Sequence, residues 1–308
     1  MHVLLIHNPE AGEGHPTPDE LRTAAESAGH EVRYASTKEP DWEQALADPA
    51  DMVISAGGDG TVAKLVPALA GSGIPLALLP LGTANNIALT LGLSSDWRAA
   101  IAGLPYGSRR RFDCGSARGP WGAAGFIESV GAGLVTHLIE TADAAPVEAA
   151  LEQAPVPDRF DDIRRLCGHL LGNVEAANYT IDADGVDLSG RYLLVEVMNI
   201  RSIGPRLRLS PEADPGDGML DLVLIDERAR ELFAADIRSW ADNWAHATPW
   251  PVQRVQRVTI AGENLAFHVD DQPMPTGPAG KGRLSTGQVT VEVTGYVEIV
   301  VPRDGGTP

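Results

Sequence analysis

Residues 51–66 read DMVISAGGDGTVAKLV, and this stretch indicates a strand, a tight turn and a helix in succession. The first part, residues 51–56, is apolar and short enough to be a buried parallel strand, while residues 61–66 restore a helical pattern. The turn consists of Gly57, Gly58, Asp59, Gly60 and Thr61. Glycines let the backbone approach a ligand and point N–H groups at it, and a helix N-terminus favours anions. The turn therefore predicts a phosphate site, where Asp59 needs a divalent cation or a hydroxyl beside it, as in phosphoryl transfer.

Two other loops follow buried-type strands in the same way. The strands are expected at residues 74–79 and 2–6. Because the carboxyl ends of parallel strands meet at one edge of an open sheet, we expect all three loops to line one crevice. The small and polar residues of the two further loops are Asn8, Pro9, Gly12, Gly82, Thr83 and Asn85.

The pattern of elements divides the chain in two. Residues 1–110 alternate strand and helix at short spacing, which predicts a Rossmann-like parallel α/β domain. Residues 111–294 contain mainly strands and hairpin turns, which predicts an antiparallel β-sandwich-type domain. The last segment, residues 295–308, is expected to return to the first domain. The fold class is thus α/β followed by antiparallel β.

Several local features are also predicted. Residues 17–20 form a capping box that starts a helix, and residues 41–48 indicate a second, short helix. Pro67 is expected to kink or end the helix after the glycine turn. Residues 142–157 are rich in alanine, proline and acids, which predicts an exposed loop, and residues 159–171 predict an amphipathic helix.

The bulk composition bounds the partners and the compartment. A net charge of −18 over 308 residues argues against nucleic acid, which is bound by clustered lysine and arginine. No apolar run reaches the roughly 20 residues that span a bilayer, so we expect at most transient membrane contact. The arginines at 109–111 and at 201, 206 and 208 would face lipid headgroups or a phosphorylated substrate or, as is more common, pair with carboxylates. The absence of a leader before the first strand and two cysteines in no motif favour the cytoplasm. The oligomeric state stays open, with a homodimer as one option.

Taken together, these motifs resemble the diacylglycerol-kinase-type catalytic domain family, which includes bacterial lipid kinases and sphingosine kinases. The family is distantly similar to NAD kinases and phosphofructokinases. Residues 57–61 match its G-G-D-G-T turn, and residues 80–85, PLGTAN, match its P-x-G-T-x-N element. Residues 8–12, NPEAG, resemble its N-P-x-S-G element with Ala11 at the serine. Thr37 matches a threonine near the adenine side of the nucleotide.

The resemblance implies an ATP-dependent kinase that transfers the γ-phosphoryl group to the hydroxyl of a lipid or a related alcohol. ATP and Mg²⁺ would lie across the loops of the first domain, with Asp59 beside the cation or the acceptor hydroxyl. Residues 209–221 resemble the family's P-x-A-x-x-x-D-G-x-x-D segment, which implies a structural magnesium ion at Asp214, Asp217 and Met219. From spacing alone, a turn stabilised by the aspartate side chains is equally consistent.

The chain departs from the family at its presumed general base, the glutamate of a D-G-E element. Asp270 matches the aspartate, Asp271 replaces the glycine and Gln272 replaces the glutamate. Glutamine accepts no proton at neutral pH, so Asp270 or Asp271 would have to take the role. Lys64 and Asn86 also replace acidic residues of the family.

Two accounts fit these departures. In one, the protein remains a kinase, because phosphoryl transfer depends mainly on positioning. In the other, it is an attenuated member that binds nucleotide or lipid in a regulatory role. His268 and His137 are alternative bases, although such histidines are more commonly structural. A dinucleotide-dependent oxidoreductase is disfavoured because no G-x-G-x-x-G follows the first strand, and NAD kinase remains a variant within the kinase class.

Overall fold

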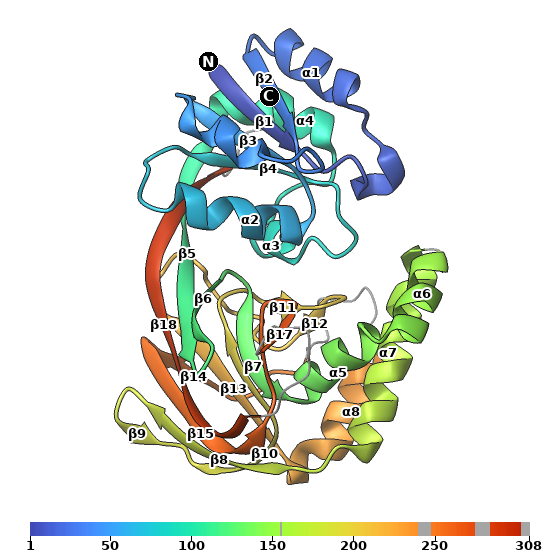
Figure 1. Ribbon diagram of the computed structural model, residues 1–308, viewed down its shortest axis with the longest axis vertical. Helices are drawn as coiled ribbons and strands as arrows, with labels where there is room; N and C mark the ends of the chain where they lie inside the picture. Colours follow the sequence, from blue (N-terminus) through green and yellow to red (C-terminus); the bar gives the residue numbers. More distant parts are fainter. Residues whose placement is uncertain (155, 240–247, 275–283, 303–308) are drawn as a thin grey trace. The chain divides into compact units, whose positions relative to one another are not determined.

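The computed structural model describes residues 1–154, 156–239, 248–274 and 284–302. By its internal contacts the chain divides into two units (Figure 1). The first unit contains residues 1–114 and the segment from Gly295 onward, and the second unit contains Gly115–Thr294. The part of the last segment beyond residue 302, which was expected to return to the first domain, lies outside the described residues.

The first unit is built on a parallel sheet in the strand order β2-β1-β3-β4. Its strands are β1 (His2–His7), β2 (Glu31–Ser36), β3 (Met52–Gly57) and β4 (Leu76–Pro80). The end of β18 (Leu284–Val301) adds a parallel strand, because Ile299 and Val300 pair with Leu76 and Ala77 of β4. All of β3 is buried, which explains its unbroken run of apolar and small residues.

Short helices connect these strands. They are α1 (Pro18–Ser27), α2 (Asp59–Leu69), α3 (Asn86–Thr90), α4 (Trp97–Gly103), and the 3₁₀ helices η1 (Ala11–Gly14), η2 (Trp42–Ala47) and η3 (Leu104–Tyr106). The predicted capping box of α1 is confirmed, since Thr17 and Glu20 each accept the other's backbone N–H. The helix expected at 41–48 is the 3₁₀ helix η2. Pro67 lies within α2, which ends two residues later at Leu69.

The second unit is an antiparallel β structure. Its main strand order is β17-β16-β7-β10-β8-β15-β18, and β13 and β14 extend from β10. The strands are β5 (Ser108–Gly119, which begins in the first unit), β6 (Gly122–Phe126), β7 (Ser129–Gly133), β8 (Ala177–Ala183), β9 (Val186–Asp187), β10 (Gly190–Met198), β13 (Leu220–Asp226), β14 (Val252–Val255), β15 (Arg257–Leu265), β16 (Phe267–Val269), β17 (Gln272–Met274), and the separate hairpin β11 (Ser202–Ile203) and β12 (Leu207–Arg208). Phe126, Val195 and Phe267 belong to its buried core. The predicted fold class is confirmed.

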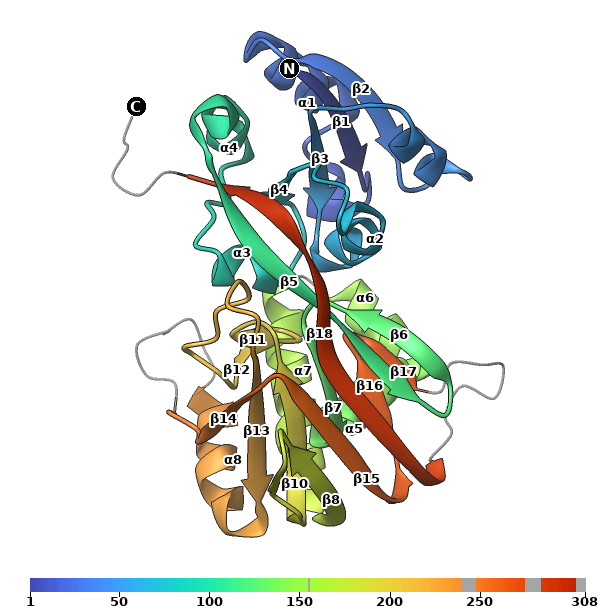
Figure 2. The same ribbon diagram turned by 90° about the vertical axis from the view of Figure 1, so that its left-hand side faces the viewer.

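Helices cover one face of this β structure, as Figures 1 and 2 show for α5, α7 and α8. The helices are α5 (Leu134–Ala142), α6 (Ala145–Gln153), α7 (Val156–Asn173), α8 (Arg230–Ser239) and the 3₁₀ helix η4 (Glu227–Ala229). A second core, which includes Leu134, Cys167 and Phe233, fills the space between them and the strands. Within the part of the chain that the structure describes, no helix is long and apolar enough to cross a membrane.

The loop expected at residues 142–157 was a wrong prediction, because most of this segment is the helix α6. A proline at the first turn of a helix loses no hydrogen bond, and alanine is the strongest helix former. Pro146 stands at such a position, with Glu148 also in the first turn. The same composition that suggested a loop therefore suits a short helix. The helix expected at 159–171 is confirmed within α7.

Candidate active site

The backbone ties the three predicted loops to one edge of the first unit's sheet. Strand register places His7 beside Ala56 and Gly57 beside Pro80, so β1, β3 and β4 end together. Beyond these pairs, the Asn8 N–H donates to the Ala56 carbonyl at 2.9 Å. The Leu81 N–H donates to the Gly57 carbonyl, also at 2.9 Å. The convergence of the three loops follows directly from these strand ends.

The loops after β3 and β4 touch backbone to backbone. A Cβ added at Gly82 would lie 2.4 Å from the Gly58 Cα, and one added at Gly58 would lie 3.0 Å from the Gly82 Cα. No side chain larger than hydrogen fits between them without a shift of the backbone. Gly12 lies beside the same loop, since its added Cβ would be 3.5 Å from the Leu81 carbonyl oxygen. The glycines of all three loops therefore gather in one place.

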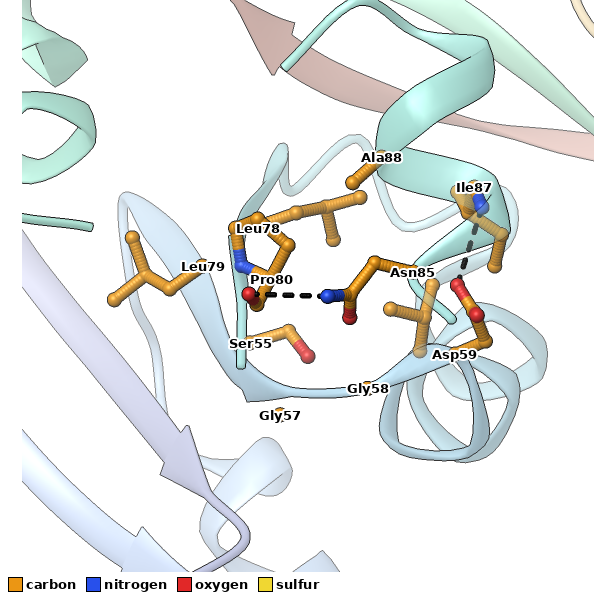
Figure 3. A pocket seen from close by; sticks show the side chains of 11 residues that line it. Ser55, Gly57, Gly58, Asp59, Leu78, Leu79, Pro80, Asn85, Ile87 and Ala88 are labelled. Carbon is orange, nitrogen blue, oxygen red and sulfur yellow. Dashed lines mark hydrogen bonds between the residues drawn. The ribbon is translucent and has the colours of Figure 1, made fainter. Parts of the chain in front are cut away.

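Asp59 connects two helices. It is the first residue of α2, and its carboxylate accepts the Asn86 N–H at 2.8 Å. It also accepts the Ile87 N–H at 3.1 Å, the contact drawn in Figure 3. These two donors open α3, so Asp59 caps that helix from across the site. The capped helix begins 27 residues after Asp59 in the sequence. The carboxylate is thereby fixed in direction before any ligand binds.

Asn85 closes the loop after β4. Its backbone is left-handed, at φ 51°, and its side-chain amide donates to the carbonyls of Gly82 at 2.6 Å and Pro80 at 3.2 Å. Behind the loops lies a cavity of about 10 Å³, lined in part by Ser55 and Asn85 (Figure 3). This is room for about one water molecule and none for a nucleotide. A ligand larger than water would have to bind on the solvent side, where Gly60 and Thr83 are exposed.

The end of β1 also carries a residue that the sequence interpretation missed. His7 is buried, and its Nδ1 lies 3.1 Å from the Tyr34 hydroxyl. Burial lowers the pKa of His7. The His7 carbonyl accepts the Thr37 N–H at 2.8 Å, which places Thr37 at the same edge of the sheet. A histidine directly after the apolar run of residues 3–6 was the available signal.

In the second unit, strand register brings the two remaining groups of candidates to one edge. The Asp270 N–H donates to the Ser129 carbonyl at 2.8 Å, and Ser129 is paired with Met198. Met198 is paired in turn with Asp221, and Asp221 with Arg254. This row crosses β7, β10, β13 and β14. The turn at Asp270 and the acidic segment before Asp221 therefore lie at the same end of the strands.

Asp270 anchors a turn. Its backbone is left-handed, at φ 50°, and its carboxylate accepts the N–H groups of Ile127, Glu128 and Ser129 at 2.8–3.2 Å. Burial raises the pKa of Asp270 to about 6, against the opposing effect of these N–H bonds. Its oxygens are thus engaged in holding the connection between β6 and β7.

Asp271 and Gln272 are exposed, in contrast to Asp270. Since Val269 pairs with Gln272, Asp270 and Asp271 form a two-residue hairpin turn and not a continuous strand. The alternation of side chains that holds in a strand therefore does not apply here. The Gln272 amide donates to the Asp271 carboxylate at 2.9 Å, so the glutamine orients its acidic neighbour.

His268 holds the strand that leads into this turn. Its Nε2 lies 3.0 Å from Glu196 Oε1 and its Nδ1 lies 2.9 Å from Thr136 Oγ1. All three residues are fully buried. A Cβ at Gly131 would lie 2.1 Å from Glu196 Oε2, so the glycine makes room for this contact. The geometry favours the structural role for His268. His137 is partly exposed on α5, 3.6 Å from Glu140.

The predicted metal ligands form a turn of their own. The Asp217 N–H lies 3.4 Å from the Asp214 carbonyl, and the Asp214 carboxylate accepts the Gly216 N–H at 3.1 Å. Asp217 accepts the Met219 N–H at 2.9 Å and also pairs with Arg254. Among residues 1–154, 156–239, 248–274 and 284–302, no group of three or more acidic, histidine or cysteine residues is arranged for a metal ion. Such groups consist of side chains alone, so the magnesium ion at Asp214, Asp217 and Met219, held in part by backbone carbonyls, stays a prediction.

In the basic cluster at residues 109–111, two arginines pair with carboxylates, which is the more common of the predicted alternatives. Arg109 lies 2.9 Å from Glu298, and Arg111 lies 2.5 Å from the buried Asp113. In the second cluster, Arg201 and Arg208 donate to backbone carbonyls of the 211–213 turn.

Comparison with known proteins yields two family matches. Residues 2–117 match the diacylglycerol kinase catalytic domain, and residues 168–293 match the YegS C-terminal NAD kinase beta sandwich-like domain.

Several curated proteins are similar over much of the chain. A diacylglycerol kinase of Staphylococcus epidermidis is 26% identical over 97% of this chain and 92% of its own length. A diacylglycerol kinase of Bacillus subtilis is 28% identical over 69% of this chain and 64% of its own length. A protein of Pseudomonas aeruginosa named "Probable lipid kinase YegS-like" is 28% identical over 72% of this chain and 71% of its own length. Among solved structures, that of a diacylglycerol kinase from Bacillus anthracis has a TM-score of 0.65 at 20% identity, covering 97% and 96% of the two chains. At that identity the similarity shows the shared fold.

Proposed function

We propose that this chain, a member of the diacylglycerol-kinase-type lipid kinase family, transfers the γ-phosphoryl group of ATP to the hydroxyl of a lipid or a related alcohol. Its membership follows because it joins a diacylglycerol kinase catalytic domain to a YegS-type C-terminal domain. The family resemblance drawn from the motifs is thereby confirmed. The nucleotide, its magnesium ion and the acceptor are the parts that this proposal adds.

One observation carries the proposal, namely the contact between Gly58 and Gly82 with Asp59 fixed beside it. Triphosphate would lie on the solvent side of these loops, where the backbone comes close enough for N–H groups to meet phosphate oxygens. A carboxylate offers about four lone-pair positions, so Asp59 can cap α3 and still face the magnesium ion of MgATP. The cation spreads the charge that develops on the phosphoryl group, and the loops keep the donor in line.

On the acceptor side, we assign different tasks to the two aspartates of the hairpin turn. Asp270 holds the turn through its three backbone N–H bonds. Asp271 is exposed and is oriented by Gln272, so it can accept the hydroxyl proton of the alcohol. A loose transition state requires little help from a base, and an oriented surface carboxylate is adequate for it.

The test is ATP consumption against a panel of lipid and soluble alcohols, with mass detection of the phosphorylated product. We expect Asp59→Asn to abolish turnover, because it removes the charge that faces the cation. Asp19→Asn is the matched control, since Asp19 is an exposed aspartate in the first turn of α1. If Asp59→Asn phosphorylated the acceptor at the parent's rate, the assignment of Asp59 would be wrong.

The attenuated, regulatory alternative rests on Gln272, which stands where the family has its glutamate. Stabilisation by MgATP without any product from the panel would favour this alternative. Gln272→Glu separates the two accounts, because a large gain in turnover would indicate a site that is weakened at its base.

A further inference from the structure

Arg254 lies directly across from an aspartate of the acidic segment. Strand β14 pairs with β13 so that Arg254 stands opposite Asp221, and side chains of directly opposed residues share one face of the sheet. The guanidinium pairs with the Asp217 carboxylate through Nη2, and its Nε lies 4.0 Å from Asp221 Oδ1. A single arginine therefore faces both aspartates of the D-G-x-x-D segment.

Neutral donors occupy the other oxygens of these two carboxylates. Asp217 Oδ1 accepts the Met219 N–H at 2.9 Å, and Asp221 Oδ2 accepts the Ser210 hydroxyl at 2.5 Å. Each aspartate thus has one oxygen on a neutral donor and the other toward Arg254. Burial raises the pKa of Asp221, while Ser210 and Arg254 favour its charged form. The arrangement supplies positive charge to the segment from within the chain.

We propose that Arg254 is the resident cation of the acidic turn at residues 214–221, and that the turn needs no divalent metal ion. Mg²⁺ requires about six oxygen ligands in a near-octahedral shell at roughly 2.1 Å. One oxygen of Asp217, the carboxylate among the predicted ligands, is already paired with a guanidinium, which is planar and charged at every physiological pH. A divalent ion at the same place would also be repelled by it. Arginine and metal therefore exclude one another here. This inference does not depend on the proposed reaction.

The experiment follows thermal unfolding without nucleotide, in EDTA and in millimolar Mg²⁺, with Mn²⁺ binding measured by electron paramagnetic resonance. The parent protein should unfold at the same temperature in both conditions and bind no Mn²⁺ at this turn. Arg254→Gln should unfold about 2–4 °C lower in EDTA, and Mg²⁺ should restore that loss, because two carboxylates are then left without a cation. The double variant Arg254→Gln with Asp217→Asn should lose the response to Mg²⁺.

Two further variants keep the test decisive. Arg254→Lys retains the charge and should remain insensitive to Mg²⁺ even if the glutamine variant fails to fold. Arg257→Gln is the matched control, because it removes an ion pair between Arg257 of β15 and Glu292 of β18, away from the acidic turn, and should gain no response to Mg²⁺. Two results overturn the proposal: a rise in the parent's unfolding temperature with Mg²⁺ that Asp217→Asn abolishes, or a folded Arg254→Gln variant that ignores the metal.

Discussion

Replacing Gly82 by alanine should damage both the stability and the proposed activity of the site. The added Cβ would lie 2.4 Å from the Gly58 Cα and 2.8 Å from Asn85 Oδ1. Real Cβ atoms stay at least 3.0 Å from such neighbours, so the two loops must separate by the difference, about 0.6 Å. The neighbour is backbone, which cannot rotate away as a flexible side chain would.

The magnitude follows from two effects. Overpacking of this kind costs about 1–3 kcal/mol of unfolding free energy. A displacement approaching 1 Å between groups that hold a reacting phosphate lowers the rate by about 100-fold. Because Asp59 follows Gly58 directly, the shift also disturbs its bonds to Asn86 and Ile87.

The assay compares chemical denaturation and ATP turnover for Gly82→Ala and Gly103→Ala. Gly103 ends α4 in the same unit, has negative φ and has nothing within 4 Å of an added Cβ, so its replacement should leave both quantities unchanged. Equal stability and equal turnover in the two variants would refute the backbone contact as the basis of the site.

Two other predictions concern the second unit. The pKa of Asp270 is about 6 in the folded protein against an ordinary 3.8, so folding disfavours its charged form. The protein should therefore lose stability as the pH rises from about 4 to 6, and its stability should level off above that range. Asp270→Asn should lack this slope, and identical pH profiles of the parent and the variant in denaturation would contradict the reasoning. His268→Gln should lower the free energy of unfolding by about 3–5 kcal/mol, because it leaves Glu196 buried without its partner. Adding Glu196→Gln should recover part of that loss. Strict additivity in the double-mutant cycle would show that the two side chains are not coupled.

Much of the fold was predictable because strand ends and glycine turns are local signals. The run at 51–61 indicates a buried strand, a tight turn and a helix start within one short window, and β3 and α2 lie there. The prediction for residues 142–157 was wrong because this segment contains no such specific signal. Its alanines and acids are compatible with a loop or a helix, and the first-turn position of Pro146 decides between them.

The contacts within the site were harder to predict from the sequence, because they depend on which residues of distant segments come to lie side by side. Asp59 meets the start of α3 at a separation of 27 residues, Arg254 meets Asp217 at 37, and His268 meets Glu196 at 72. A shift of one residue in β14 would turn Arg254 to the other face of the sheet. Residue types alone identified Asp217 as a candidate ligand, but the competing cation comes from a strand that the sequence pattern did not mark.

The pairing of Ile299 and Val300 with β4 has a consequence for synthesis on the ribosome. The first unit takes strands from both ends of the chain, so its sheet cannot be completed until nearly all of the polypeptide has emerged. Until then, β4, whose residues Leu76, Ala77 and Leu79 are fully buried in the finished protein, presents an open apolar edge to the cytosol of any expression host. A nascent chain stalled before residue 299 should therefore be a client for chaperones, and a fragment that stops near residue 114 should aggregate.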